Sequence, residues 1–307
     1  MNVKEWALII FTILAQMSVG AFLVLGAVHL YVSRKADSAE ADRMSDRALL
    51  AIIVTLGLGL LASLFHLGDP LSSPRAISNV ATSWLSREIL FGAGFAVLGA
   101  LFAAMRWFKW GTFALRNAVA WLAGLVGVGL IYCMSRAYML PTQPAWNTIA
   151  TPISFYATSL LLGALALGVA FFVNYRIITV KHPDCADCQA ALLRDVLGWL
   201  AVLAIAALGV EFVIIPIHMG ILGMGNAAAT ASVKLMLGTY GVAFVLRLLL
   251  AFVGVAVFGV FMYQNAKEAG KIQLLGTLAT SAFVLALAAE LIGRYLFYAT
   301  RVGINLL

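Results

Sequence analysis

Hydrophobic residues follow one another in long runs along this chain, and short polar segments separate the runs. A helix needs about 20 apolar residues to cross the hydrocarbon core of a bilayer. Runs of that length predict eight membrane-spanning helices, at residues 7–32, 48–67, 85–105, 117–140, 152–175, 196–217, 236–263 and 273–298. The first run is longer than the apolar core of a signal peptide and has no clear cleavage signal after it, so we expect it to be retained. The pattern predicts an all-α integral membrane protein.

The connections between the predicted spans are short. The longest, residues 176–195, has 20 residues, so we expect a single membrane domain over residues 1–307 without a soluble domain. Two pairs of similar words suggest an internal repeat: FHLG (65–68) with IHMG (217–220), and SRAYML (135–140) with GRYLFY (293–298). The spacing fits two tandem four-helix bundles with halves at 1–140 and 150–307, and chance similarity explains it equally well.

Lysine and arginine are concentrated in the first, third, fifth and seventh connections. These connections hold twelve of the 20 basic residues: Arg34, Lys35, Arg43, Arg47, Arg106, Lys109, Arg116, Arg176, Lys181, Arg194, Lys267 and Lys271. Cytoplasmic loops of membrane proteins are enriched in these two residue types. We therefore expect both termini, and the polar stretch FHLGDPLSSPRAIS at residues 65–78, on the non-cytoplasmic side.

Composition agrees with a membrane protein. Hydrophobic residues make up 63% of the 307 and charged residues 11%, against about 45–50% and about 25% in soluble domains. The net charge is +7, but the basic residues form no stripe, which argues against nucleic-acid binding.

Three cysteines limit the redox chemistry that the chain itself can hold. Cys133, Cys185 and Cys188 are too few for the four thiolates that an iron-sulfur cluster usually needs, so any such cluster belongs to a partner. Cys185 and Cys188 with His182 offer three ligands, an incomplete zinc site. We expect reduced thiols there and no metal.

Ionisable residues within membrane spans are costly to bury and mark candidate functional positions. The predicted spans or their ends hold Glu88, Arg136, Glu211, Arg247, Glu290, Arg294, His66 and His218. Nearly all of them lie in the outer half of the expected bundle. This asymmetry predicts a polar cavity that opens to the outside and is closed to the cytoplasm.

Four of these residues are expected to form buried ion pairs. Glu290 and Arg294 are spaced i, i+4 with the acid first, an order that favours mutual neutralisation. Arg247 is alone on its span and needs a carboxylate from across the bundle, either Glu211 or Glu290. One interpretation makes these pairs purely structural, and another makes them, with Glu88, the relay of a proton-coupled transporter.

Haem is a further alternative, because His66 and His218 could ligate the iron of a b-type cytochrome. His66 is followed by a Gly-Asp-Pro helix exit and His218 follows Pro216, which are positions typical of helix ends. Glu88 is adjacent to Arg87, and neighbours on a helix point in different directions, so Glu88 is free for other chemistry.

Several words of the sequence together resemble one family. FHLGDP (65–70), SWLSREIL (83–90), PAWN and TP within residues 144–152, and AELIGRYLFY (289–298) are similar to the DmsC-type membrane anchor subunits of dimethyl sulfoxide reductase. The resemblance covers nearly the whole chain and includes eight spans.

The resemblance implies a haem-free anchor in a three-subunit complex of anaerobic respiration, in the cytoplasmic membrane of a bacterium or archaeon. The anchor would hold a four-cluster iron-sulfur subunit and a molybdopterin catalytic subunit to the bilayer, and exchange electrons with a quinone pool, typically menaquinol. Carried over by position, His66 and Glu88 belong to the family's quinol site. Cys185 and Cys188 have no counterpart in the family pattern.

Quinol oxidation fits these residues chemically. It releases two protons, for which a neutral imidazole at His66, with an ordinary pKa of about 6.5, and a carboxylate at Glu88 are suitable acceptors. Trp84 and Phe91 can form an apolar wall. Arg75 or Arg87 can supply positive charge or contact the iron-sulfur subunit, and Asp69 can contribute or simply cap the turn. The expected quinone-binding set is His66, Asp69, Arg75, Trp84, Arg87, Glu88 and Phe91.

Overall fold

The structure is a computed structural model, and it describes residues 3–35, 38–64, 77–181, 183–268 and 270–304. Within these residues the regular structure is helical, and eight helices are long and apolar enough to cross a membrane. Seven spans are single α-helices: α1 (Val3–Val32), α2 (Ser38–Leu64), α4 (Trp84–Trp107), α5 (Phe113–Tyr138), α6 (Ala150–Lys181), α7 (Ala186–Gly223) and α11 (Ile272–Ala299). The predicted all-α, eight-span fold is confirmed.

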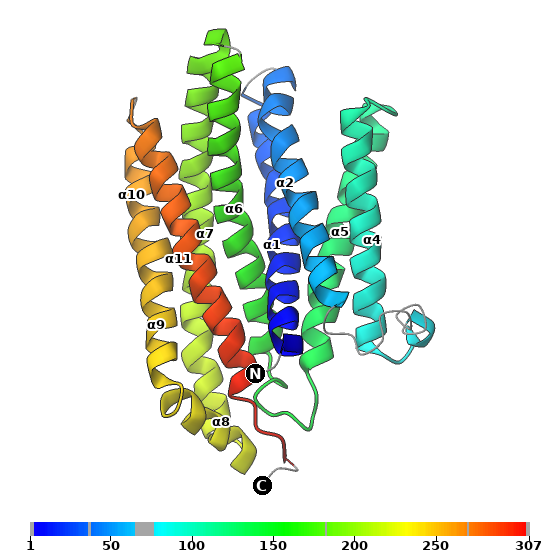
Figure 1. Cartoon of the computed structure of the whole chain (residues 1–307), viewed down its shortest axis with the longest axis vertical. Helices are drawn as coiled ribbons and strands as arrows, with labels where there is room; N and C mark the ends of the chain where they lie inside the picture. The colour runs from blue at the N-terminus through cyan, green and yellow to red at the C-terminus, as the bar shows by residue number, and fades with distance from the viewer. Residues whose placement is uncertain (1–2, 36–37, 65–76, 182, 269, 305–307) are drawn as a thin grey trace.

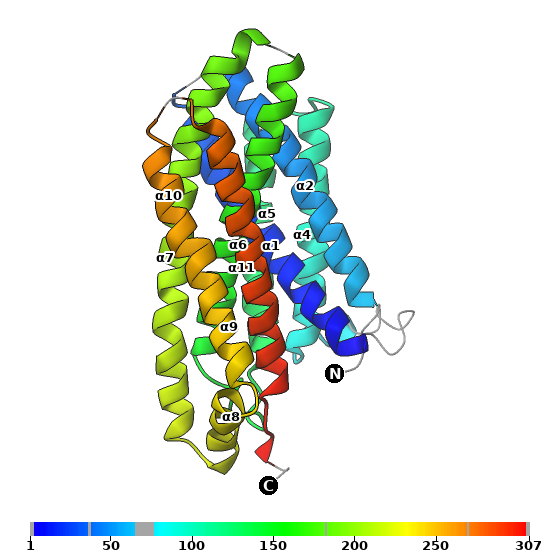
Figure 2. The same cartoon turned by 60° about the vertical axis from the view of Figure 1, so that its left-hand side comes forward.

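The remaining span is a composite helix. It consists of α9 (Gly241–Ala251), the π-helix η4 (Phe252–Val257) and α10 (Phe258–Asn265), and Figures 1 and 2 show the three pieces as one continuous rod. Three short helices lie between spans: η2 (Ile77–Asn79), η3 (Pro183–Cys185) and α8 (Ala227–Leu237).

Two predicted boundaries were wrong. The seventh span was expected to begin at residue 236, but α8 ends at Leu237 and the chain turns at Gly238 before α9 starts. The sixth span was expected to end at 217, near Pro216, but α7 continues through this proline to Gly223. His218 is therefore inside a helix, because a single missing backbone hydrogen bond does not end a helix held by its neighbours.

The helices pack as neighbours along the chain, with α1 at the centre. This helix packs against both α2 and α6, while α4 pairs with α5, α6 with α7, and α11 with α9 and α6. The approach of α1 to α6 is close because Gly20 and Gly163 face each other there, and a side chain on either would overlap the opposite backbone. Small residues at such positions are typical of helix packing in membranes.

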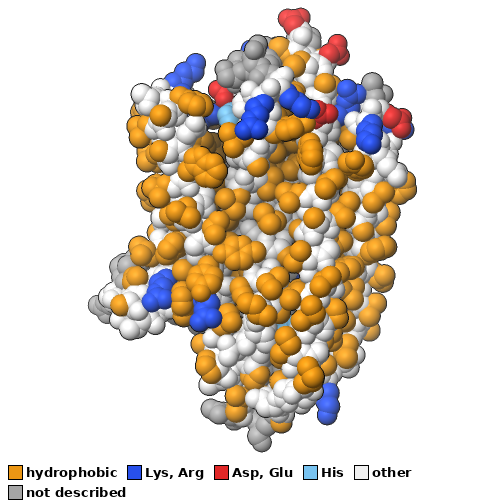
Figure 3. All heavy atoms as spheres, turned by 180° about the vertical axis from the view of Figure 1, so that it is seen from behind, with side chains coloured by type: hydrophobic (Ala, Val, Ile, Leu, Met, Phe, Trp, Pro, Cys, Tyr) orange, Lys and Arg blue, Asp and Glu red, His pale blue; other side chains and the backbone are white. Residues whose placement is uncertain are grey.

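Both termini lie at the same end of the bundle, together with α8 and the first turn of α4 (Figure 1). We call this the termini end. Figure 3 shows apolar side chains covering the flank of the bundle, and charged side chains gathered mainly at the opposite end. That opposite end carries the connections rich in lysine and arginine. Its assignment to the cytoplasm stays a prediction, as does the division into superposable halves.

Candidate functional site

Four of the predicted site residues share one face of α4. Trp84, Arg87, Glu88 and Phe91 follow the i, i+3, i+4, i+7 spacing that places helical side chains in one row. The helix starts at this point because the Ser83 side chain accepts a hydrogen bond from the backbone nitrogen of Ser86, at 3.3 Å. The row therefore begins at the termini end and faces α5.

Arg87 is held by the segment that precedes its own helix. Its Nε donates to the carbonyl of Val80 at 2.8 Å and its Nη2 to the carbonyl of Ala81 at 2.7 Å. The guanidinium also lies 4.2 Å from the centre of the Trp84 ring, a cation–π contact. These contacts brace the entry to α4 and leave the adjacent carboxyl group without this cation.

Glu88 is a buried carboxyl group with 6% of its surface exposed. It makes no hydrogen bond or ion pair with any residue that the structure describes. Tyr138 and Tyr298 lie within electrostatic range of it. Arg136 comes near on α5, where its guanidinium lies 5.2 Å from the Trp84 ring and its Nε is buried without a hydrogen-bond partner in the described structure.

The ring of Phe91 lies against Gly129 of α5. A Cβ atom at residue 129 would overlap this ring, so only glycine allows the contact. Trp84 meets Tyr132 of the same helix edge-to-face, with ring centres 5.7 Å apart. Both aromatic residues of the expected wall thus lie between α4 and α5.

Three of the predicted site residues, His66, Asp69 and Arg75, lie outside the described residues. Their stretch joins the end of α2 to η2, which precedes α4. Their roles stay predictions.

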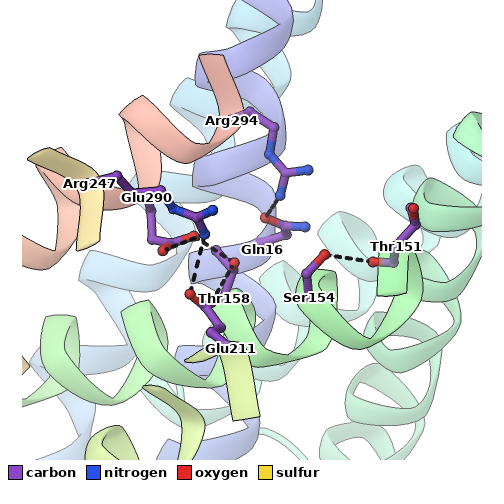
Figure 4. A network of polar contacts seen from close by, with 8 residues as sticks. All are labelled: Gln16, Thr151, Ser154, Thr158, Glu211, Arg247, Glu290 and Arg294. Atoms are coloured by element: carbon purple, nitrogen blue, oxygen red, sulfur yellow. Dashed lines mark hydrogen bonds and ion pairs between the residues drawn. The ribbon is translucent and has the colours of Figure 1, made fainter. Parts of the chain in front are cut away.

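A second group of predicted residues meets between α6, α7, α9 and α11, as Figure 4 shows. Arg247 places Nη2 3.4 Å from Glu211 Oε2 and 3.5 Å from Glu290 Oε1. The hydroxyl oxygen of Thr158 lies 3.0 Å from Glu211 Oε1 and 2.7 Å from Glu290 Oε2. The single arginine of α9 therefore faces both expected carboxylates.

Arg294 has different neighbours from those expected. Its Nη2 donates to Gln16 Oε1 of α1 at 2.8 Å, and its guanidinium lies 4.0 Å from the centre of the Phe155 ring. Glu290, four residues earlier, is within electrostatic range but is engaged by Arg247.

A cavity of about 110 Å³ adjoins this cluster. Polar side chains from four helices line it: Thr151, Ser154, Thr158, Glu211, His218, Arg247, Glu290 and Arg294. His218 Nε2 is engaged by the backbone carbonyl of Ala145 at 3.0 Å, which makes it a donor there.

Sequence reasoning missed the uncharged polar members of both groups. Thr158, Gln16 and the tyrosines 138 and 298 lie in apolar helices and carry no charge to draw attention. The available signal was an isolated polar residue one or two turns from an ionisable one, but such residues are frequent, and only packing shows which of them meet.

These observations define the class: a multi-pass, all-helical membrane protein with buried ionisable groups close to one end. The family model of the DMSO reductase anchor subunit, DmsC, matches residues 1–300. The chain therefore belongs to the DmsC family and is a membrane anchor subunit of a molybdoenzyme complex.

Curated relatives agree with this assignment. One chain of the anaerobic dimethyl sulfoxide reductase of Haemophilus influenzae is 28% identical over 297 residues, which cover 96% of the present sequence and 94% of the relative. Its namesake from Escherichia coli is also 28% identical, over 304 residues, with 98% and 96% covered. A sulfite dehydrogenase subunit of Allochromatium vinosum matches over 57% of each sequence at 28% identity.

One solved structure shares the fold. A chain of the bd oxidase from Geobacillus thermodenitrificans superposes with a TM-score of 0.67 over 98% of this protein and 85% of its own length, at 13% sequence identity. At this identity the likeness concerns the arrangement of helices alone.

Proposed function

We propose that this protein is a haem-free anchor subunit that binds quinol and passes electrons between menaquinol and a partner iron-sulfur subunit. A molybdopterin-containing subunit would complete the complex, as the relatives named for anaerobic dimethyl sulfoxide reductase suggest. The cytoplasmic membrane of a bacterium or archaeon is its proposed location. Family membership favours this function over the proton-coupled transporter and over a b-type cytochrome with His66 and His218 as ligands.

The observation that carries the proposal is the state of Glu88. A buried carboxyl group without a cationic partner is costly, and such groups are typical of sites where protons move. Glu88 stands near the start of α4, at the termini end, and η2, which the stretch containing His66 precedes, packs against α4.

The side chains around Glu88 fit a quinone. Its carboxylate is an acceptor for a ring hydroxyl, and Arg136 Nε is a buried donor without a partner in the described structure. Trp84 and Phe91 close the site on the α5 side, where their rings are fixed by Tyr132 and Gly129.

A bound quinol supplies two electrons and two protons when it is oxidised. Glu88 takes one proton at its carboxylate oxygen, and His66 takes the other at a ring nitrogen. Arg87 holds the entry to α4 in place, and Asp69 and Arg75 contribute from the stretch before it. The protons leave at the termini end, which the charge pattern predicts to face outward.

His66→Ala and Glu88→Gln test this proposal in the assembled complex. We expect each to reduce quinol-dependent turnover by at least about 100-fold, the usual contribution of a positioned acid or base, while activity with an artificial electron donor to the iron-sulfur subunit is kept. Glu268→Gln is the matched control, because Glu268 is exposed at the opposite end and pairs only locally with Lys271 at 2.7 Å. Full quinol turnover in both variants would refute the site.

A further inference from the structure

The hydroxyl group of Thr158 lies between two carboxyl groups from different helices. Its oxygen is 3.0 Å from Glu211 Oε1 and 2.7 Å from Glu290 Oε2. A threonine hydroxyl carries one hydrogen, so it can donate to only one of them. The other short contact becomes a hydrogen bond when that carboxyl group is protonated and donates to the threonine oxygen. The geometry thus fits one proton more than two ionised carboxylates would carry.

The charges around the pair agree with this count. Arg247 is the one cation within ion-pair distance of Glu211 and Glu290 in the described structure. The other two ionisable groups of the cavity are directed elsewhere, because Arg294 donates to a glutamine of α1 and His218 bonds a backbone carbonyl. The α6 and α8 side chains of the lining carry no charge. One guanidinium balances one carboxylate, and a bound proton neutralises the second.

The adjoining cavity is suited to water. Its volume of about 110 Å³ corresponds to about three water molecules, at ~30 Å³ each, and is less than the ~150 Å³ that accommodates benzene. Two buried polar atoms of its lining residues, Glu290 Oε1 and Arg294 Nε, have no hydrogen-bond partner in the described structure. Water molecules satisfy such atoms in polar cavities.

The cavity leads toward the termini end only. Its lining includes Leu222 near the end of α7 and Thr300, which caps α11. Glu290 lies ten residues before Thr300, which places it roughly 15 Å deeper at the rise of an α-helix. In the other direction α11 continues with the buried residues Ala286 and Ala282, and α7 with the buried Leu208.

Two local features keep Arg247 in this position. Gly293 lies under its guanidinium, and a Cβ atom there would overlap it. The π-helix η4 begins five residues after Arg247, and π-helical turns within α-helices often occur at functional sites.

We propose that Glu211, Thr158 and Glu290 form a proton-holding site that exchanges one proton with water at the termini end. On release, the proton passes from the carboxyl group to a cavity water, and the carboxylate left behind stays beside Arg247. The site lies in a different part of the bundle from Glu88, and the proposal does not rest on quinol chemistry.

Infrared spectroscopy of the resting, fully assembled complex at neutral pH tests the proposal without turnover. We expect the spectrum to contain one protonated-carboxyl band that is missing in Glu211→Gln and also in Glu290→Gln, because the remaining carboxyl group then pairs alone with Arg247 and ionises. The band should shift after transfer to heavy water. Glu268→Gln, at an exposed position, is the control and should keep the band.

Thr158→Val provides a second test that retains both carboxyl groups. It removes the shared hydroxyl, so the band should move in frequency while its intensity stays, even if either glutamine variant fails to assemble. Loss of only ionised-carboxylate intensity in both glutamine variants, or no effect of Thr158→Val, would overturn the shared proton. A band that does not respond to heavy water would overturn the exchange.

Discussion

The hydroxyl groups of Tyr138 and Tyr298 lie 2.6 Å apart and connect the last turn of α5 to the last turn of α11. The contact stands between the two candidate sites, because Glu88 and Arg294 are both within electrostatic range of this pair. Tyr298 is also within hydrogen-bonding reach of Thr12 of α1. A series of hydroxyl groups thus ties three helices together near the termini end.

This arrangement predicts unequal effects of removing either hydroxyl. Tyr298→Phe leaves Tyr138 without its partner and should lower the free energy of unfolding by about 1–3 kcal/mol, the cost of a buried unsatisfied group. Tyr138→Phe should cost less, because Tyr298 keeps Thr12. Thermal unfolding of the detergent-solubilised complex measures the difference. The double variant should cost less than the sum of the two, and strict additivity would contradict a direct contact.

A second prediction concerns the glycine under Arg247. Gly293→Ala places a methyl group where the guanidinium lies, so Arg247 must move away from its carboxylates. Forcing a side chain out of a packed position typically costs about 1–3 kcal/mol, which should appear as a lower unfolding temperature.

Gly209→Ala on α7 is the control, since nothing lies within 4 Å of the added methyl group. It should leave stability unchanged or raise it by up to about 1 kcal/mol, because alanine favours a helix more than glycine. Equal unfolding temperatures for the two variants would show that Arg247 is not held against Gly293.

The close contact between Gly129 and Phe91 predicts an effect on the α4 site. Gly129→Ala pushes the Phe91 ring away from α5 and displaces the face that carries Glu88. We expect quinol-dependent turnover to fall about tenfold or more, because a shift of about 1 Å near reacting groups can have that effect. Gly99→Ala on α4, with nothing within 4 Å of the added methyl group, should not change turnover. Activity with an artificial donor should be the same in both.

The spans were predictable because each needs a continuous apolar run, but their ends were not. The helix α6 extends to Lys181, and α7 starts at Ala186, ten residues before its predicted boundary. Helices that project beyond the hydrocarbon use polar residues, which hydrophobicity alone assigns to loops. The short α8 was merged with the next span for the converse reason, since it is apolar as well.

The charged members of the polar cluster were predictable and their partners were not. Any ionised group within a span must find a counter-charge, so Arg247 was expected beside Glu211 or Glu290. Glu290 and Arg294 are four apart on one helix, which favoured a local pair, but a guanidinium from α9 reaches the carboxylate instead. Sequence spacing describes one helix at a time, whereas these contacts depend on how helices are set against each other.

The orientation of the bundle gives the last prediction. Cys188 is exposed and Cys185 is half-buried at the end opposite the termini, whereas Cys133 is buried within α5. If that end faces the cytoplasm, a membrane-impermeant thiol reagent should not label the protein in intact cells and should label it after the cells are opened. Ile304→Cys, at an exposed position of the termini end, combined with Cys185→Ser and Cys188→Ser, should be labelled in intact cells. The reverse pattern would place the termini in the cytoplasm, and the protons released at Glu88 would then leave on that side.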